Sequence, residues 1–118
     1  MIIKFSENEW FTAGDQTTLK EVLDPLKLHL HLPFSMAFAF LEKGEISLLH
    51  TLNTTEVYFI TNGNGEILID DNRSEIAKGD VIIVQPLCKQ SLKNIGNTRL
   101  EFVCIVSPPW TKEGEQIL

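Results

Sequence analysis

The side chains best suited to chemistry are His50, Glu56, Tyr58 and Gln90. An imidazole can act as an acid, a base or a metal ligand near neutral pH. A carboxylate pairs with it or binds a cation, and an amide offers a weaker, neutral oxygen ligand. Glu56 and Tyr58 are two residues apart, so on a β-strand both would point to the same face.

Strand alternation also predicts the neighbours of these side chains. His50 and Leu52 share a face if they lie on a strand. Gln90 is expected to point inward because the polar residues that alternate with it should reach water: Lys89, Ser91 and Lys93. Cys104 is expected on the apolar face opposite Glu101.

The segments that carry these residues predict an all-β protein with short turns. The strand Glu56 to Thr61 is followed by Asn62-Gly63-Asn64-Gly65, a strong hairpin turn. The run Val81 to Val84 is apolar on both faces and is predicted to be buried on both sides. Alternating small residues in Phe34 to Leu41 (Ser35, Ala37 and Ala39) indicate either a cavity or a tight sheet contact.

The two ends of the chain are less regular. Thr17 to Leu23 fits either a helix or an edge strand, and Trp110 to Leu118 fits one turn of helix packed by Trp110. At 118 residues the chain has the size of a single domain, spanning 1–118.

Charge and hydropathy exclude several classes of partner. The formal net charge is −6 and there is no Lys/Arg cluster, so no nucleic-acid partner is expected. No apolar run approaches the ~20 residues that span a bilayer, so no membrane association is expected. The N-terminus is too short and too acidic for a secretory signal. We therefore expect a cytoplasmic protein with Cys88 and Cys104 as free thiols.

Two spaced motifs, at 44–63 and 79–94, resemble those of the cupin family. The first has Gly44, His50, Glu56 and Gly63 at the family's spacing, with Leu52 where a second histidine is usual. In the second, Gly79 opens the motif and Asn94 closes it. There Pro86 comes one place late, Leu87 replaces a glycine, and Gln90 stands at the histidine position.

The resemblance implies a single antiparallel β-barrel of the double-stranded β-helix, or jelly-roll, type with irregular ends. It also implies an inward-facing site on which His50, Glu56 and Gln90 would hold one divalent metal (Zn, Ni, Mn or Fe), or none. The predicted pocket is completed by Tyr58, Leu52 and Cys104. Leu52 offers no donor atom, so two of the family's four metal ligands are replaced.

Three functions remain open at this point. The protein is a metal-dependent enzyme or binder, a metal-free isomerase or epimerase of a sugar or keto acid, or a non-catalytic small-molecule sensor. In the second, His50 is the base, Tyr58 the acid, and Glu56 sets the tautomer of the imidazole. A homodimer is expected from the family's habit and from the apolar pair Val57 and Phe59. His29 and His31 are expected on the surface.

Overall fold

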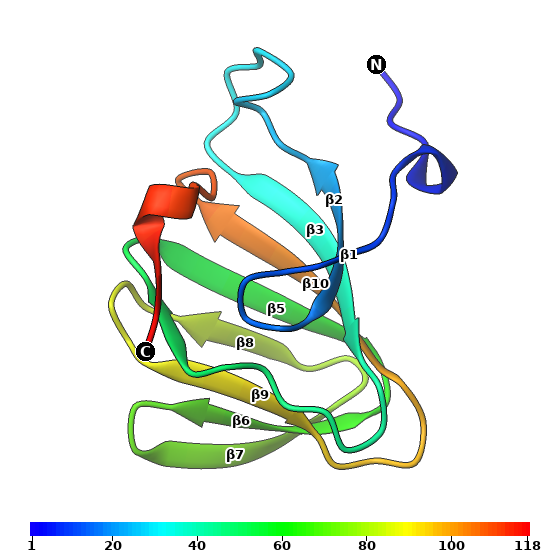
Figure 1. The fold of residues 1–118 in the computed structure, drawn as a ribbon, viewed down its shortest axis with the longest axis vertical. Helices are drawn as coiled ribbons and strands as arrows, with labels where there is room; N and C mark the ends of the chain where they lie inside the picture. Colours follow the sequence, from blue (N-terminus) through cyan, green and yellow to red (C-terminus); the bar gives the residue numbers. More distant parts are fainter.

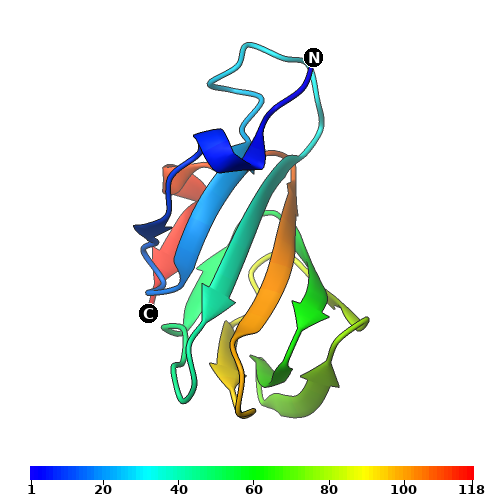
Figure 2. The ribbon, with the colours of Figure 1, turned by 90° about the vertical axis from the view of Figure 1, so that its right-hand side faces the viewer.

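Two antiparallel β-sheets make up the fold in the computed structural model, which describes residues 1–118 (Figure 1). The six-stranded sheet runs in the order β1 (Phe11–Thr12), β2 (Thr18–Leu23), β3 (Ser35–Leu41), β10 (Leu100–Ser107), β5 (Thr55–Asn62), β8 (Val81–Val84). The five-stranded sheet runs in the order β11 (Glu115–Ile117), β4 (His50–Leu52), β9 (Gln90–Asn94), β6 (Asn64–Ile69), β7 (Asn72–Ala77). Figure 2 shows β2, β3 and β10 side by side in the first sheet. The predicted all-β, antiparallel jelly-roll fold is confirmed.

The core lies between the sheets and follows strand alternation. Every second residue of β10 is buried (Leu100, Phe102, Cys104 and Val106). The first three of these belong to a single apolar cluster with side chains from both sheets. The hairpin between β5 and β6 turns at Gly63, whose φ is +89°. A Cβ there would lie 2.7 Å from the carbonyl oxygen of Arg99, so the turn requires glycine at this position.

The strand β8 corrects one expectation. The run Val81 to Val84 was predicted to be buried on both faces, yet Val81 is 60% exposed and Ile83 57% exposed. The strand is the edge of its sheet and only its inner face is covered, so Ile82 and Val84 alone are buried. An apolar run tells which residues avoid water, but not how many layers cover them.

The strand β9 corrects a second expectation from the sequence. Ser91 was predicted to reach water with Lys89 and Lys93, but it is buried. Its hydroxyl donates to the carbonyl of Ser47 at 2.8 Å, and the Ser47 hydroxyl accepts from the amide of Leu92 at 2.9 Å. The segment before β4 covers this side of the strand and satisfies its polar groups.

The ends of the chain are more extended than predicted. Of the two alternatives for Thr17 to Leu23, the strand is correct, as β2. The tail has a short 3-10 turn, η2 (Lys112–Gly114), and then the strand β11, which pairs with β4. Near the N-terminus another 3-10 turn, η1 (Phe5–Glu7), leads to Trp10, which packs edge-on against Phe40 of β3. None of the helical turns is long enough to cross a bilayer.

Candidate functional site

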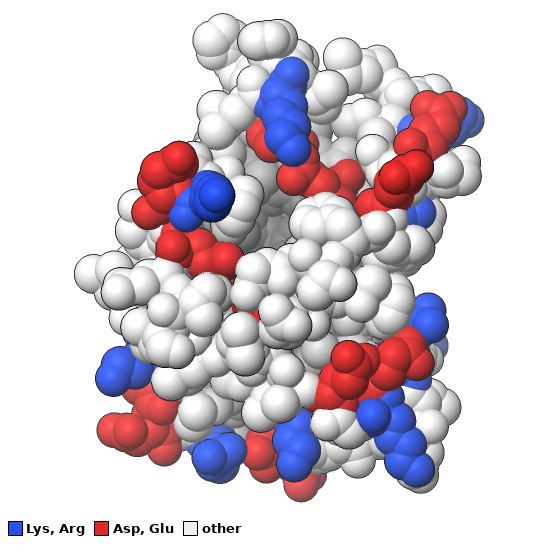
Figure 3. Space-filling model, viewed as in Figure 1, with Lys and Arg blue, Asp and Glu red and all other residues white.

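A cavity of about 120 Å³ opens on the side of the molecule where β1, the β1–β2 loop and the C-terminal tail come together. We call it the inner pocket. Its lining comes from both sheets and from the two ends of the chain, and just over half of the lining residues are hydrophobic. Figure 3 shows a hollow on this face with acidic side chains beside it. An apolar cavity of roughly 150 Å³ can hold benzene, so the enclosed part suits a ligand group of about six non-hydrogen atoms.

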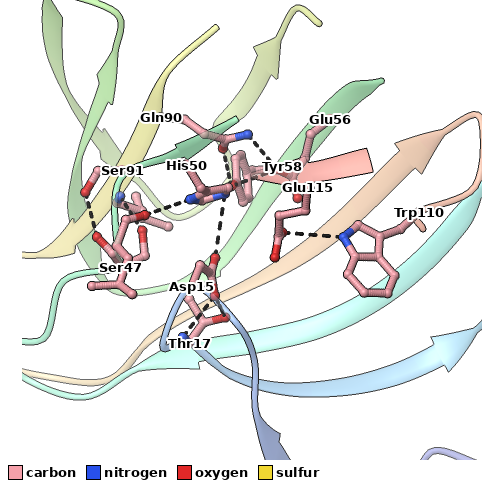
Figure 4. A network of polar contacts seen from close by, with 12 residues as sticks. Asp15, Thr17, Ser47, His50, Glu56, Tyr58, Gln90, Ser91, Trp110 and Glu115 are labelled. Carbon is pink, nitrogen blue, oxygen red and sulfur yellow. Dashed lines mark hydrogen bonds and ion pairs between the residues drawn. The ribbon is translucent and has the colours of Figure 1, made fainter. Parts of the chain in front are cut away.

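The deepest polar groups of the inner pocket form a closed network of hydrogen bonds (Figure 4). The Tyr58 hydroxyl donates to Gln90 Oε1 at 2.5 Å, and Gln90 Nε2 donates to Glu56 Oε1 at 2.9 Å. The Tyr58 oxygen also lies 3.0 Å from Glu56 Oε1. The register explains why they meet, because Glu56 and Tyr58 share a face of β5 while Gln90 extends from β9 in the opposite sheet.

The acidic protons of this network belong to Tyr58 and Glu56. Tyr58 has a single hydroxyl proton, and Gln90 Oε1 is its nearer acceptor. The same hydroxyl also donates to Glu56 Oε1 at 3.0 Å, so the two acceptors share this one proton. Burial raises the pKa of Glu56 to about 7, although His50, Tyr58 and Gln90 each lower it. Glu56 is therefore a carboxyl group that holds a proton close to neutral pH.

His50 lies at the start of β4 and is only 2% exposed. Its Nδ1 is 2.7 Å from the carbonyl oxygen of Leu48, which can only accept, so Nδ1 must carry a proton. The remaining nitrogen, Nε2, lies 3.7 Å from Asp15 Oδ2. The tautomer was predicted to be set by Glu56; the backbone of Leu48 sets it instead.

Asp15 reaches His50 from the loop between β1 and β2. The amide and hydroxyl of Thr17 both donate to Asp15 Oδ1, at 3.1 Å and 2.7 Å, which leaves Oδ2 directed toward the imidazole. The Asp15 carbonyl accepts from the amide of Leu48 at 2.7 Å. The loop is thus held against the segment that carries His50.

Glu115 enters the inner pocket from the tail. One carboxylate oxygen accepts from the indole nitrogen of Trp110 at 3.4 Å, and both residues line the cavity. Partial burial raises the pKa of Glu115, and the nearby imidazole of His50 lowers it. The tail therefore adds one more carboxyl group and one aromatic wall.

The structure places the six predicted site residues as follows. His50, Glu56, Tyr58 and Cys104 line the inner pocket, and Gln90 lies behind them, bonded to two of them. Leu52 is buried but does not line the cavity. Burial raises the pKa of the Cys104 thiol well above its usual value, so this cysteine stays protonated.

Other residues of the site were not found from the sequence. Asp15, Trp110 and Glu115 carried no motif, because each lies in an irregular end of the chain that only the tertiary fold brings to His50. One signal was present: the small residues Ser35 and Ala37 do line the inner pocket. The cavity interpretation is correct for Ser35 and Ala37, whereas Ala39 packs in the apolar core. His29 and His31 are exposed and do not line the pocket.

The residues do not fit the divalent metal that the cupin resemblance implies. No group of three or more His, Cys, Asp or Glu side chains in the chain is arranged to hold an ion. The set has a single imidazole, and both ends of the Gln90 amide are already used by Tyr58 and Glu56. Glu56 also holds a proton near neutrality, and a metal would have to displace it.

Known proteins resemble this chain in sequence or in fold. A curated relative, the uncharacterised protein MJ1618 of Methanocaldococcus jannaschii, is 33% identical over 92% of this chain and 86% of its own. A predicted oxalate decarboxylase of Thermotoga maritima superposes with a TM-score of 0.78 at 24% identity, over 92% of this chain and 99% of that one. Pac13, a nucleoside dehydratase of Streptomyces, superposes with a TM-score of 0.80 at 16% identity, over the whole of this chain and 90% of that one.

The likeness to the solved structures, below 25% identity, concerns the fold. The family model described as "Cupin domain" matches residues 37–106, from within β3 to within β10, and this range carries His50, Glu56, Tyr58 and Gln90. With the motifs, the two sheets and this match in agreement, the chain belongs to the cupin family.

Proposed function

We propose that this cupin binds a small organic molecule in the inner pocket and transfers protons on it without a metal. His50 is the base and Glu56 the acid. The observation that carries the proposal is the pairing of an imidazole whose Nδ1 is fixed by Leu48 with a buried carboxyl group that holds a proton near pH 7. Groups with pKa values near the working pH are the most effective in acid–base catalysis.

The reaction class follows from these two groups. His50 Nε2 takes a proton from one atom of the ligand, and Asp15 stabilises the imidazolium that forms. Glu56 gives its proton to a neighbouring atom of the ligand, which yields an isomer, or to the opposite face of the same atom, which yields an epimer. The product is an isomer or epimer of the substrate, so no oxidant, reductant or second substrate is consumed.

Tyr58 and Gln90 act as positioning residues in this scheme. Burial raises the pKa of Tyr58 well above its ordinary value, so the phenol keeps its proton. Its hydroxyl and the Gln90 amide hold the Glu56 carboxyl in place. The acid role given to Tyr58 in the sequence analysis therefore passes to Glu56.

Solvent deuterium exchange tests the proposal. Small molecules that bind would be identified by ligand-observed NMR and then incubated with the protein in D₂O. We expect a carbon-bound proton of the true substrate to exchange with wild-type protein and not with His50→Gln or Glu56→Gln. The matched control is His31→Gln, which replaces an exposed histidine outside the pocket.

Three outcomes would count against the proposal. Deuterium exchange that persists in His50→Gln would show that His50 is not the base. Binding without any exchange would favour the non-catalytic sensor. Elemental analysis that finds one tightly held metal ion per chain would restore the metal-dependent alternative.

We also propose that the protein is a homodimer. On the outer face of the six-stranded sheet, Val57 of β5 lies opposite Ile83 of β8, and Phe59 lies opposite Val81. Phe59, Val81 and Ile83 are exposed, so three of these four adjacent apolar side chains lack cover. Light scattering should give the mass of a dimer, and Ile83→Glu should give a monomer. Ser74→Glu, on the exposed strand β7 of the other sheet, is the control; a monomeric wild type would refute this assignment.

A further inference from the structure

The inner pocket has a charge pattern that the acid–base scheme does not use. Five carboxyl side chains line it and no Lys or Arg does: Asp15, Glu21, Asp24, Glu56 and Glu115. From this lining we infer that the ligand carries a positive charge, as a small ammonium compound does. The inference rests on the proposed function, because it names the ligand class of the same pocket.

The negative charge persists after the cation paired with a lining carboxylate and the lining histidine are counted. Lys27 pairs with Glu21 at 3.0 Å from outside the lining, and His50 adds a second cation when it is protonated. Even with Glu56 neutral, four carboxylates then face two cations. In a cavity with apolar walls such an excess acts strongly on a ligand, because little water screens it.

A buried atom also faces the cavity with no protein partner. Glu56 is 7% exposed, and both hydrogen bonds to its carboxyl group involve Oε1. No fully enclosed side-chain oxygen or nitrogen in the chain lacks a hydrogen-bond partner. The other carboxyl oxygen of Glu56, Oε2, has no hydrogen-bond partner, so it must be in contact with the open space of the pocket. There it can accept a hydrogen bond from a ligand N–H.

The walls suit the same ligand. Trp110, Phe11, Tyr58 and Phe102 line the cavity, and aromatic faces attract cations as well as apolar groups. An ammonium group donates up to three hydrogen bonds and accepts none, which matches a pocket rich in acceptors. A carboxylate or phosphate ligand would meet His50 as its one lining cation. The keto acid considered in the sequence analysis is therefore disfavoured.

Three probes of similar shape test the inference by calorimetry or ligand-observed NMR at pH 7: cyclohexylamine, cyclohexanol and cyclohexanecarboxylate. We expect the amine to bind about tenfold more tightly than the carboxylate, as a charge-assisted hydrogen bond allows. Asp15→Asn and Glu115→Gln should each weaken the amine several-fold and leave the alcohol unchanged. Glu113→Gln is the matched control, an exposed glutamate of the same tail that does not line the pocket.

The results separate this inference from the proposed function. A preference for the amine that survives in His50→Gln supports the cationic ligand even if no substrate shows deuterium exchange. Tighter binding of the carboxylate would overturn it, and so would binding of none of the three at millimolar concentration. Equal losses of amine and alcohol in Asp15→Asn would overturn it too, because they would show a structural role for the aspartate.

Discussion

The floor and the rim of the inner pocket are built from different parts of the chain. The floor consists of His50, Glu56, Tyr58 and Gln90, all within residues 37–106 that match the family. The rim consists of Asp15, Glu21, Asp24 and Glu115, all outside that range. The family part of the chain thus supplies the groups that would do chemistry, and the two ends supply the charge that would select the ligand.

The two regions also differ in how firmly they are held. Every floor residue is buried on a strand and bonded to neighbours within the protein. The rim residues are half-buried, and those of the loop and the tail depend on a few local contacts. Changes in the floor should therefore alter turnover and stability strongly, whereas changes in the rim should alter binding with little cost in stability.

The largest difference between floor variants and rim variants is expected in the rate of turnover. His50→Gln removes the base and should slow deuterium exchange of a substrate by about 100-fold or more. Asp15→Asn leaves the imidazole in place and should slow exchange by about tenfold, because only the stabilisation of the imidazolium is weakened. Exchange rates measured by NMR at saturating substrate would test this order. Equal losses in both variants would erase the distinction between floor and rim.

The next effect is on stability as a function of pH. The pKa of Glu56 is raised from 4.5 to about 7 in the folded protein, so folding favours the protonated carboxyl. This contribution is fully present below pH 4.5 and is lost as the pH rises to about 7. Glu56→Gln cannot ionise, so it should gain stability relative to wild type over that window, by on the order of 3 kcal/mol.

Urea denaturation at several pH values between 4.5 and 8 would measure this difference. Titrating groups that do not interact with Glu56 contribute equally to both proteins and cancel. The exposed Glu113→Gln should follow the wild-type profile. Parallel curves for wild type and Glu56→Gln would show that the carboxyl is not protonated in the folded state near neutrality.

Removal of the Tyr58 hydroxyl should have a smaller effect. Tyr58→Phe keeps the edge-on contact with Phe102 but leaves Gln90 Oε1 without its donor, which typically costs about 1–3 kcal/mol. The Tyr58 hydrogen bond lowers the pKa of Glu56. The pH at which stability falls should therefore move upward in this variant. A loss of stability with no such movement would mean that Tyr58 does not bond to Glu56.

The smallest effect is expected at the rim. Glu115→Gln removes a half-buried carboxyl whose one bond, to Trp110, is long. Stability should change by less than about 0.5 kcal/mol, as is usual for such sites. A urea midpoint that moves by an amount comparable to that of Tyr58→Phe would show that the rim is as tightly built as the floor.

The difference between floor and rim also explains what the sequence could predict. Alternation on a strand fixes which residues share a face, so the shared face of Glu56 and Tyr58 could be inferred from spacing alone. The cupin resemblance was needed to bring Gln90 to the same site. Asp15 and Glu115 contact the site through a loop and a tail whose paths depend on long-range pairing. No local sequence pattern predicts that β11 pairs with β4.

The wrong predictions have the same origin. Ile83 is exposed and Ser91 is buried because of what covers each strand, not because of the residues of the strand itself. The role of Leu48 was invisible for another reason: its contribution is a backbone carbonyl, which every residue possesses.

The pairing of β11 with β4 links the mobility of the tail to that of the histidine. The strand β4 has three registered pairs with β11 but only one with β9, between His50 and Gln90. If the tail frays, the backbone of His50 loses most of its neighbours. Slow opening of this edge would then loosen the imidazole and carry Glu115 away in one event. The amides of Leu118 and Asn53, which donate across this ladder, should exchange with solvent at a common, low opening free energy.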